Sequence, residues 1–327
     1  MKAIVVENPT GPQGLVYRDI PSPEPGPEDL LVNVKATALN RADLLQSHGG
    51  YPQPGPRPDF EVLGIEFAGE VTATGSRVQG FAPGDRVLGL LPGGGYAEQA
   101  VTHQRLAVRV PDRLSWIEAG SLPEVFITAH DALLQAGLVA GESVLIHAAG
   151  SGVGVAAIQV ARALGAGLLI GTAGSAAKLE RAQALGLNVG VNYREEDFAK
   201  VVLEATGGRG VDVVIDVIGA DYWAANLKAL ALKGRMTMVG LMSGARVDAN
   251  LGLLLGKRLQ VRGTTLRARP LEEKAAATQL FAKSVIPHIQ SGGVNPVIDR
   301  TFPLAQAAAA LAYMETNANF GKIVLEV

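Results

Sequence analysis

The chain carries the sequence V-L-I-H-A-A-G-S-G-V-G at residues 144–154. It begins as an apolar strand, continues as a turn of small residues and ends as a helix start, the order in which backbone amides and the helix dipole meet a pyrophosphate. A full G-x-G-x-x-G pattern would need glycine where the chain has Ala149 and Ser151, and only Gly154 fits it. By itself, the stretch therefore fits both a dinucleotide site and a tight packing turn.

Helix and strand patterns alternate from residue 115 onward. Apolar runs typical of buried strands lie at 143–148, 167–172, 189–192, 211–217, 236–240 and 259–264. Helical patterns lie between them at 152–164, 176–185, 195–206 and 223–232. The alternation predicts an α/β fold with a doubly wound, parallel, six-stranded Rossmann sheet, whose first strand leads into the glycine turn.

The remaining segments predict a second domain that this sheet interrupts. Short β-type runs at 2–7, 15–19, 30–38, 67–74 and 86–91 indicate a mostly antiparallel β domain. Helical patterns occur at 271–290 and 304–316, and an apolar strand at 322–327. Because so apolar a strand needs a sheet to join, we expect it to return to the N-terminal β domain. The predicted domains are 1–123 with 268–327, and 124–267.

Composition narrows the class of protein. The chain has 327 residues, 48% hydrophobic and 18% charged, and a net charge of −2, which favours a two-domain globular protein with no general attraction for nucleic acid or anionic membranes. The absence of cysteine excludes disulfides and thiolate metal sites. Glycines and polar residues interrupt the uncharged stretch 143–161, so we expect no membrane span, and the short apolar start of the chain fits no signal peptide. We expect a cytoplasmic protein.

The cofactor preference depends on the residues after the second strand of the parallel sheet. No Asp or Glu, the residues that bind ribose hydroxyls, occurs from 151 to 179. Ser175 and Lys178 instead offer a hydroxyl and an ammonium to a 2′-phosphate, which favours NADPH. The alternative is that Ser175 caps the next helix and Lys178 is solvated. Tyr193 fits either the adenosine phosphate or a packing role.

Three polar residues of the β domain are further candidates. Asn40 comes after an apolar strand and can bind a ribose or a substrate oxygen, or serve as an N-cap. Tyr51, in a loop stiffened by proline, can stack on a flat substrate and donate a proton, or simply anchor the loop. Glu66 lies between apolar residues, and we expect it to pair with an arginine rather than to act in catalysis.

Taken together, these residues resemble the zinc-free quinone oxidoreductases, the zeta-crystallin-like branch of the medium-chain dehydrogenase/reductase superfamily. The resemblance spans the whole chain and is nearest to the tumour-suppressor-induced NADPH quinone reductase subgroup. Its landmarks are A-L-N-R-A-D at 38–43, G-G-Y-P at 49–52, L-G-I-E at 63–66, P-G-D-R-V at 83–87, L-P-G-G-G-Y-A-E at 91–98, T-A at 128–129, the glycine turn, N-Y at 192–193 and F-G-K-I-V at 320–324. Zinc-dependent relatives have a ligand histidine where Ile65 stands, and cysteines that this chain lacks.

The resemblance implies a GroES-like catalytic domain, a Rossmann domain, NADPH as the cofactor and no metal. It implies that Asn40 and Tyr51 face the substrate. The implied cofactor-binding residues are Thr128, Gly150, Ser151, Gly152, Val153, Gly154, Ser175, Lys178, Tyr193, Gly240, Leu241, Phe320, Gly321 and Lys322. It also implies a homodimer formed through the strand at 259–264.

The sequence thus predicts an NADPH-dependent quinone oxidoreductase that transfers a hydride or electrons to a quinone in the cleft between its domains. A 2-alkenal or enoyl reductase of the same superfamily is the alternative. A non-catalytic NADPH-binding protein with a structural or RNA-binding role is a third hypothesis, which the near-neutral charge disfavours for RNA.

Overall fold

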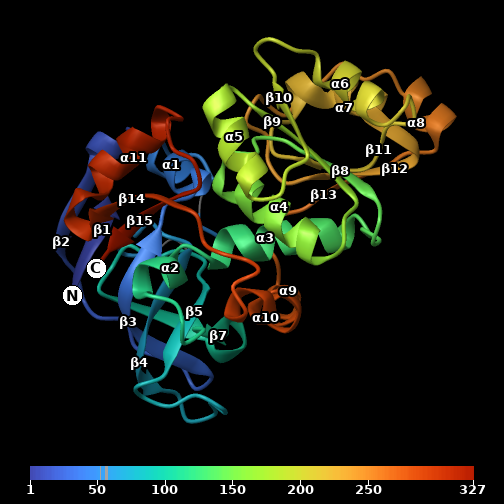
Figure 1. Cartoon of the computed structure of the whole chain (residues 1–327). Coiled ribbons are helices and arrows are strands. Elements are labelled where there is room, and N and C mark those ends of the chain that lie inside the picture. Colours follow the sequence, from blue (N-terminus) through green and yellow to red (C-terminus); the bar gives the residue numbers. More distant parts are fainter. Residues whose placement is uncertain (52, 56–57) are drawn as a thin grey trace. The chain divides into compact units, whose positions relative to one another are not determined.

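The computed structural model describes residues 1–51, 53–55 and 58–327. They form two compact units, Met1–Ile127 with Leu266–Val327 and Thr128–Thr265 (Figure 1). We call these unit 1 and unit 2. We keep the boundaries near residues 124 and 267 as a proposal for the independently folding domains.

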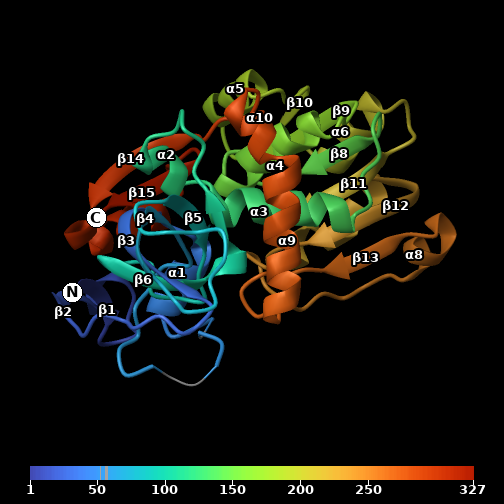
Figure 2. The ribbon, with the colours of Figure 1, turned by 90° about the horizontal axis from the view of Figure 1, so that it is seen from below.

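Unit 2 contains a parallel sheet in the order β10-β9-β8-β11-β12-β13 (Figure 2). The strands are β8 (Ser143–Ile146), β9 (Leu168–Ala173), β10 (Val189–Asn192), β11 (Val211–Asp216), β12 (Leu230–Met238) and β13 (Gln260–Gly263). The strand order reverses between β8 and β11, the place where open α/β sheets bind ligands. The predicted six-stranded Rossmann sheet is confirmed.

Helices cover both faces of this sheet. α6 (Phe198–Ala205), α7 (Trp223–Ala229) and α8 (Gly252–Lys257) pack on the face to which Leu145 and Met236 point. Thr237, the neighbour of Met236, points to the opposite face, and its hydroxyl donates to the carbonyl of Ala132 in α3 (Pro123–Gln135). α4 (Gly152–Ala163) and α5 (Ala176–Ala184) complete the crossovers.

In unit 2, one predicted helix ends early and one helix was not predicted. The predicted helix 223–232 ends at Ala229, because Leu230 and Ala231 are buried and Leu230 pairs with Val211 of the neighbouring strand. The helix α8 was not predicted, because it is short: only Leu253 and Leu254 pack against the core, Leu255 is exposed, and no repeating apolar pattern marks a helix there.

Unit 1 is built on a mostly antiparallel sheet in the order β14-β15-β3-β4-β5-β7, with β6 also paired to β3. Its strands are β3 (Asp29–Ala38), β4 (Glu66–Thr74), β5 (Arg86–Leu90), β6 (Gln99–His103), β7 (Ala107–Arg109), β14 (Ile298–Pro303) and β15 (Lys322–Glu326), and β1 (Lys2–Val6) pairs with β2 (Leu15–Asp19) separately. As expected, the final strand β15 joins this sheet, antiparallel to β3. Sequence patterns missed β6, β7 and β14, which are short or only half-buried.

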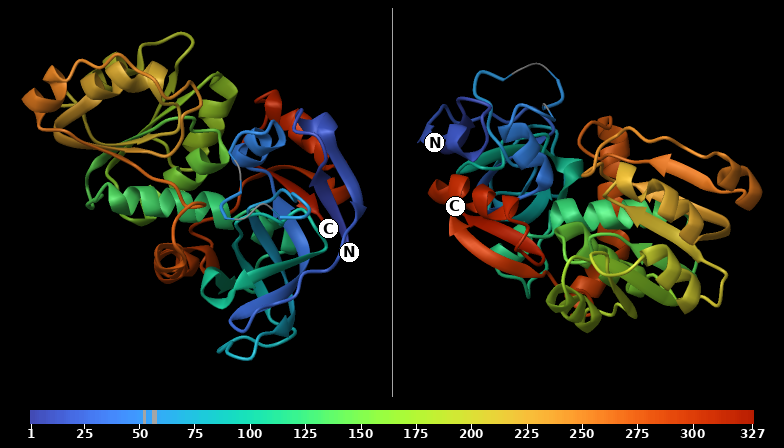
Figure 3. Two further views of the ribbon diagram at one scale, coloured as in Figure 1. Left: turned by 180° about the vertical axis from the view of Figure 1, so that it is seen from behind. Right: turned by 90° about the horizontal axis from the view of Figure 1, so that it is seen from above.

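The helices of unit 1 are α1 (Arg41–Ser47), α2 (Trp116–Gly120), α9 (Leu271–Ser284), α10 (Ile286–Gln290) and α11 (Ala307–Glu315). The predicted helix 271–290 is thus two helices, because Pro287 lacks the N–H that a continuous helix would use. Tyr96, Leu63 and Ile323 are fully or almost fully buried in a core that β15 and α11 share with β1. The N- and C-termini lie side by side in this unit (Figure 3). Met1 and Val327 line the same surface pocket.

Candidate functional site

The glycine turn of unit 2 connects β8 to α4. Ala148 adopts the left-handed conformation, with φ of 51°, and the amide of Ala149 donates to the carbonyl of Thr172 in β9 at 2.8 Å. Ser151 is the N-cap of α4, and its hydroxyl accepts the amide of Gly154 at 3.0 Å. The serine that departs from the glycine pattern therefore has a local function, which is to begin the helix.

The backbone of the turn has the space and the free amides that a pyrophosphate needs. A Cβ on Gly154 would lie 2.2 Å from the carbonyl oxygen of Ala148, so no side chain can be placed there without moving backbone. The amides of Gly152 and Val153, the first residues of α4, have no acceptor within the helix. These amides and the positive end of the helix dipole are the groups that bind phosphate in dinucleotide folds. Gly150 is buried in the same turn.

The residues predicted to contact a 2′-phosphate lie after β9 and β10, which are neighbours in the sheet. The amide of Lys178 donates to the hydroxyl of Ser175, so the predicted helix cap is formed. A Cβ on Gly174 would lie 2.7 Å from the phenol oxygen of Tyr193 and 3.2 Å from Nε of Arg194. Tyr193 is 44% exposed. The structure therefore brings Tyr193 to the segment that holds Ser175 and adds Arg194, a cation that the sequence analysis missed although it lies just past a predicted strand end.

A buried polar chain lies behind this edge of the sheet. Asn226 donates from Nδ2 to Asp216, so its Oδ1 faces Nε2 of His147 at 2.7 Å, and this ring nitrogen must carry the proton. Nδ1 of His147 then accepts from the hydroxyl of Thr172 at 3.0 Å. Burial lowers the pKa of His147 to about 4, which keeps the ring neutral. The chain ties the ends of β8, β9 and β11 to α7.

Three further predicted cofactor residues belong to unit 2. A Cβ on Gly240 would lie 3.0 Å from the carbonyl oxygen of Val217, where β11 ends. Leu241 is the next residue and is 52% exposed, and Thr128 lies almost buried in α3. Gly240 and Leu241 thus lie at the same edge of the sheet as the glycine turn.

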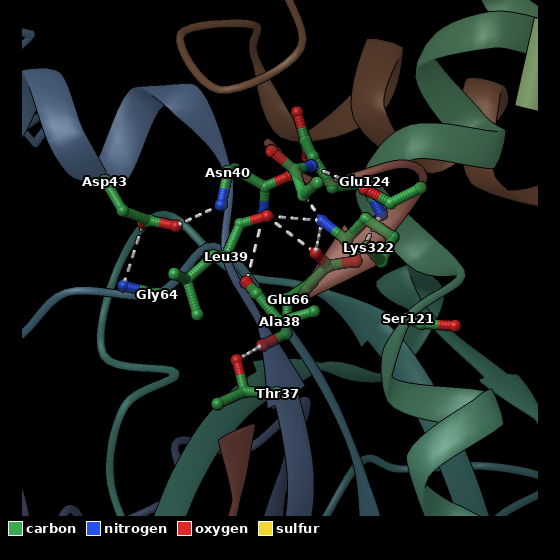
Figure 4. Close-up of polar contacts among 12 residues, drawn as sticks. Thr37, Ala38, Leu39, Asn40, Asp43, Gly64, Glu66, Ser121, Glu124 and Lys322 are labelled. Carbon is green, nitrogen blue, oxygen red and sulfur yellow. Dashed lines mark hydrogen bonds and ion pairs between the residues drawn. The ribbon is translucent and has the colours of Figure 1, made fainter. Parts of the chain in front are cut away.

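Asn40 belongs to unit 1 and occupies the N-cap position of α1, where it forms a capping box with Asp43. The side chain of Asp43 accepts the amide of Asn40 at 2.8 Å. The side chain of Asn40 donates to Glu66 at 2.7 Å and to the carbonyl of Ala38 at 3.2 Å, and it accepts from Lys322 (Figure 4). Asn40 is 8% exposed. A substrate can therefore reach only the edge of this amide.

Glu66 and Lys322 form a buried ion pair at 2.8 Å (Figure 4). The ammonium of Lys322 also donates to the carbonyl of Leu39 at 2.7 Å and to Asn40 at 2.8 Å, so all three of its N–H groups are used inside unit 1. The second oxygen of Glu66 accepts the amide of Glu124 at 2.8 Å. The expectation that Glu66 pairs with an arginine is wrong: the cation is a lysine, which comes after Gly321 at the start of β15.

Phe320 and Gly321 precede this lysine. Phe320 is 2% exposed, and Gly321 has φ of 85° and lies against the carbonyl of Val297. A cofactor role for Phe320, Gly321 and Lys322 stays a prediction.

A second buried carboxylate lies beside Asn40. Asp43 accepts the amide of Gly64 at 3.1 Å and the phenol of Tyr96 at 3.0 Å in addition to the amide of Asn40. Burial raises the pKa of Asp43 to about 6, although these hydrogen bonds favour the carboxylate. It also raises the pKa of Tyr96, which therefore stays a phenol that donates to Asp43. Asp43 and Tyr96 were not among the predicted site residues, because neither position carries a pattern of its own.

Tyr51 is 40% exposed and adopts the left-handed conformation, with φ of 53°. The guanidinium carbon of Arg267 lies 5.2 Å from the centre of its ring, and Arg267 also binds its carbonyl. The exposed ring and the anchored backbone fit both interpretations of this residue, a substrate contact and a loop anchor.

Within residues 1–51, 53–55 and 58–327, we find no group of three or more His, Cys, Asp or Glu side chains arranged to hold a metal ion. None of the helices described in this part of the chain is long and apolar enough to cross a membrane.

Two segments of the chain match known protein families. Residues 26–112 match the alcohol dehydrogenase GroES-like domain, and residues 152–283 match the zinc-binding dehydrogenase family. A quinone oxidoreductase of Pseudomonas aeruginosa is 37% identical over 96% of both chains.

Two solved structures cover the whole of this chain and of their own. A quinone oxidoreductase of Escherichia coli, complexed with NADPH, is 31% identical with a TM-score of 0.89. A protein described as an NAD-dependent alcohol dehydrogenase is 36% identical with the same TM-score. With its Rossmann sheet, its GroES-like unit and these full-length relatives, the chain belongs to the medium-chain dehydrogenase/reductase superfamily and, within it, to the quinone oxidoreductases.

Proposed function

We propose that this protein is an NADPH-dependent quinone oxidoreductase. The observation that carries the proposal is the glycine turn: Gly154 has no room for a side chain, and the amides at the start of α4 are available to a pyrophosphate. Full-length similarity to quinone oxidoreductases supports the acceptor class.

The residues of the chain would hold NADPH from several elements. Gly150, Ser151, Gly152, Val153 and Gly154 would bind the pyrophosphate, and Ser175, Lys178 and Tyr193 the 2′-phosphate. Thr128, Gly240, Leu241, Phe320, Gly321 and Lys322 complete the proposed set. When bound, the cofactor supplies a hydride equivalent, and the protein supplies binding, orientation and exclusion of water.

Asn40 and Tyr51 are proposed to face the acceptor. The exposed phenol ring of Tyr51 offers a flat surface on which a quinone can stack, and its hydroxyl is a proton source alongside water. Asn40 is held by Glu66 and Lys322, so it presents a fixed polar edge.

The proposed preference for NADPH is tested by titrating the protein with NADPH and NADH and repeating both titrations with Lys178→Ala. We expect tighter binding of NADPH by the parent protein and loss of that preference in the variant, because the ammonium pairs with the 2′-phosphate. Equal affinities of the parent protein for NADPH and NADH would contradict the assignment of Lys178 to the 2′-phosphate. The similarity to a protein described as NAD-dependent would then be the better guide to the cofactor.

The acceptor class is tested by measuring NADPH oxidation with 1,2- and 1,4-quinones and with 2-alkenals. Turnover of quinones that exceeds turnover of alkenals is expected, and the reverse would identify the 2-alkenal or enoyl reductase alternative. Tight NADPH binding without turnover on any acceptor would favour the non-catalytic protein. We also propose that no metal takes part, because the chain lacks the cysteines of its zinc-dependent relatives and has Ile65 where they have a ligand histidine. Chelators should therefore leave the rate unchanged.

A homodimer in the cytoplasm is the proposed state of the protein. Strand β13 is the edge strand of its sheet. The segment that precedes it in the chain exposes four large apolar side chains, those of Leu241, Met242, Leu251 and Leu255. A second copy that pairs edge to edge at 259–264 would cover the unpaired edge. Sedimentation of the protein and of a β13 proline variant tests this assembly.

A further inference from the structure

Arg267 is a buried cation to which the proposed function assigns no role. It lies where the chain re-enters unit 1, and it is 6% exposed. Its guanidinium donates to three acceptors: from Nε to the carbonyl of Pro92 at 2.8 Å, from Nη1 to the carbonyl of Tyr51 at 3.0 Å, and from Nη2 to Oε1 of Gln46 at 2.7 Å. One side chain therefore joins α1, the segment after it and the loop after β5.

None of these three acceptors is charged. Burial lowers the pKa of Arg267, and carboxylates act on it only from a distance. Placing a guanidinium inside a protein without a carboxylate in contact costs free energy that three neutral hydrogen bonds offset only in part. A buried aliphatic side chain would fill this space at lower cost, so stability alone is a poor explanation for an arginine here.

The residue that Arg267 holds, Tyr51, combines an unfavourable conformation with an exposed aromatic ring. Tyr51 has φ of 53°, which costs energy for a residue with a side chain. Arg267 fixes the carbonyl of Tyr51 and places its guanidinium carbon 5.2 Å from the ring centre, within the range of a cation–π contact. Tyr51 as a whole is still 40% exposed, so a ligand can reach part of this residue.

The groups around Arg267 are themselves held in place. Gln46 is 1% exposed and donates to Glu61 at 2.9 Å, which orients its amide oxygen toward Arg267. A Cβ on Gly93 would lie 2.6 Å from Oε1 of Gln53, so the loop after β5 packs closely against Gln53. Arg267 is thus held by α1 and by the loop after β5 while it binds the carbonyl of Tyr51.

We propose that Arg267 is the positioning residue of Tyr51, which it holds in the conformation that presents the ring to a flat acceptor. The inference rests on the proposed function, because the acceptor is the quinone. A stacking surface improves binding only if the aromatic ring does not have to be ordered when the ligand arrives. Loss of the arginine should therefore weaken acceptor binding and leave NADPH binding intact.

The test is a kinetic cycle of four proteins: the parent, Arg267→Lys, Tyr51→Ala and the double variant. Lysine keeps the charge but cannot make three directed hydrogen bonds from a planar group. We expect Arg267→Lys to raise the KM for a 1,4-quinone about tenfold with the dissociation constant of NADPH unchanged. In the Tyr51→Ala background, the same substitution should have no further effect, because the residue it acts through is gone. An equal effect in both backgrounds would overturn the proposal.

A matched control and a second variant separate this role from general destabilisation. Arg105→Lys changes an exposed arginine of unit 1 that pairs with exposed Glu272, and it should behave as the parent protein. If Arg267→Lys folds poorly, Gln46→Met removes one of the three acceptors while leaving Arg267 in place, and it should raise the KM in the same direction by a smaller factor. An unchanged KM in a folded Gln46→Met variant would count against the proposal that Arg267 positions Tyr51.

A readout without turnover distinguishes failure of this inference from failure of the proposed function. Amide hydrogen exchange should accelerate in peptides covering residues 44–51 and 92–96 of Arg267→Lys, but not in those of Arg105→Lys. If the parent protein reduces no quinone and the exchange still accelerates, the proposed function fails and Arg267 remains the anchor of Tyr51. If exchange is unchanged in these peptides, Arg267 does not position Tyr51.

Discussion

Removal of the Lys322 ammonium should be among the most destabilising single changes in unit 1. The substitution Lys322→Met keeps most of the side-chain volume and deletes three hydrogen bonds, to Leu39, Asn40 and Glu66, at 2.7 to 2.8 Å. Glu66 is fully buried and would keep only two donors, the side chain of Asn40 and the amide of Glu124. Leaving one partner of a buried ion pair uncompensated costs about 3–5 kcal/mol.

The assay is equilibrium unfolding in urea in a Trp223→Phe background, which removes the tryptophan of unit 2, so that the fluorescence reports Trp116 of unit 1. The expected result is a large drop of the unfolding midpoint in Lys322→Met. The control is Lys2→Met, which breaks an ion pair of 2.7 Å in the same unit whose side chains are 42% and 73% exposed. Exposed pairs contribute little, so this variant should unfold close to the parent protein.

The interaction itself is isolated by adding Glu66→Gln. Each single variant leaves one buried charge without its counterion, whereas the double variant leaves neither. The double variant should therefore lose much less stability than the sum of the two single changes. Additive losses, or a Lys322→Met midpoint equal to that of Lys2→Met, would refute the assignment of a strong buried pair.

Two further predictions concern Asp43 and Gly154. Burial raises the pKa of Asp43 from 3.8 to about 6, so protonation of Asp43 stabilises the folded state by about 3 kcal/mol. This stabilisation is complete below pH 4 and is lost as the pH rises through 6. Asp43→Asn should flatten the dependence of the unfolding free energy on pH between 4 and 7, and an unchanged profile would show that another group titrates. Gly154→Ala places a Cβ 2.2 Å from the carbonyl oxygen of Ala148 and should weaken NADPH binding at least about tenfold. In the control Gly256→Ala, nothing lies within 4 Å of the new atom, and this variant should bind NADPH as the parent protein does. Equal NADPH affinities of the two variants would contradict the assignment of the glycine turn to the cofactor site.

The parallel sheet was the part of the fold most open to prediction. The strands β8, β9 and β11 are short apolar runs between helical patterns, and such runs indicate burial on both faces. The edge strand β13, Q-V-R-G, is mostly exposed. The antiparallel sheet was predicted less completely. β7 has three residues, and the residues of β14 are half-buried or exposed, so neither strand shows an apolar run or a clear alternation.

In the candidate site too, some residues could be predicted from the sequence and others could not. The glycine turn and Ser175 are local features, and a local pattern predicts them. Lys322, Glu66 and Arg267 act through partners that lie far away in the chain, and a single sequence carries no record of which residues meet. Burial of Arg267 is especially hard to foresee, because an arginine in a segment between two elements ordinarily predicts a solvated surface.

The place of β15 in the sheet sets the order in which unit 1 can be completed during synthesis. β15 lies between β14 and β3, and Lys322 meets Asn40 from 282 positions further along the chain. Until residue 322 has left the ribosome, β3 lacks this neighbour and the carboxylate of Glu66 lacks its cation. All strands of unit 2 are translated before that point, so unit 2 is free to fold while unit 1 still waits for its last strand. Unit 1 therefore closes after unit 2, although its strands β1 to β7 are translated earlier.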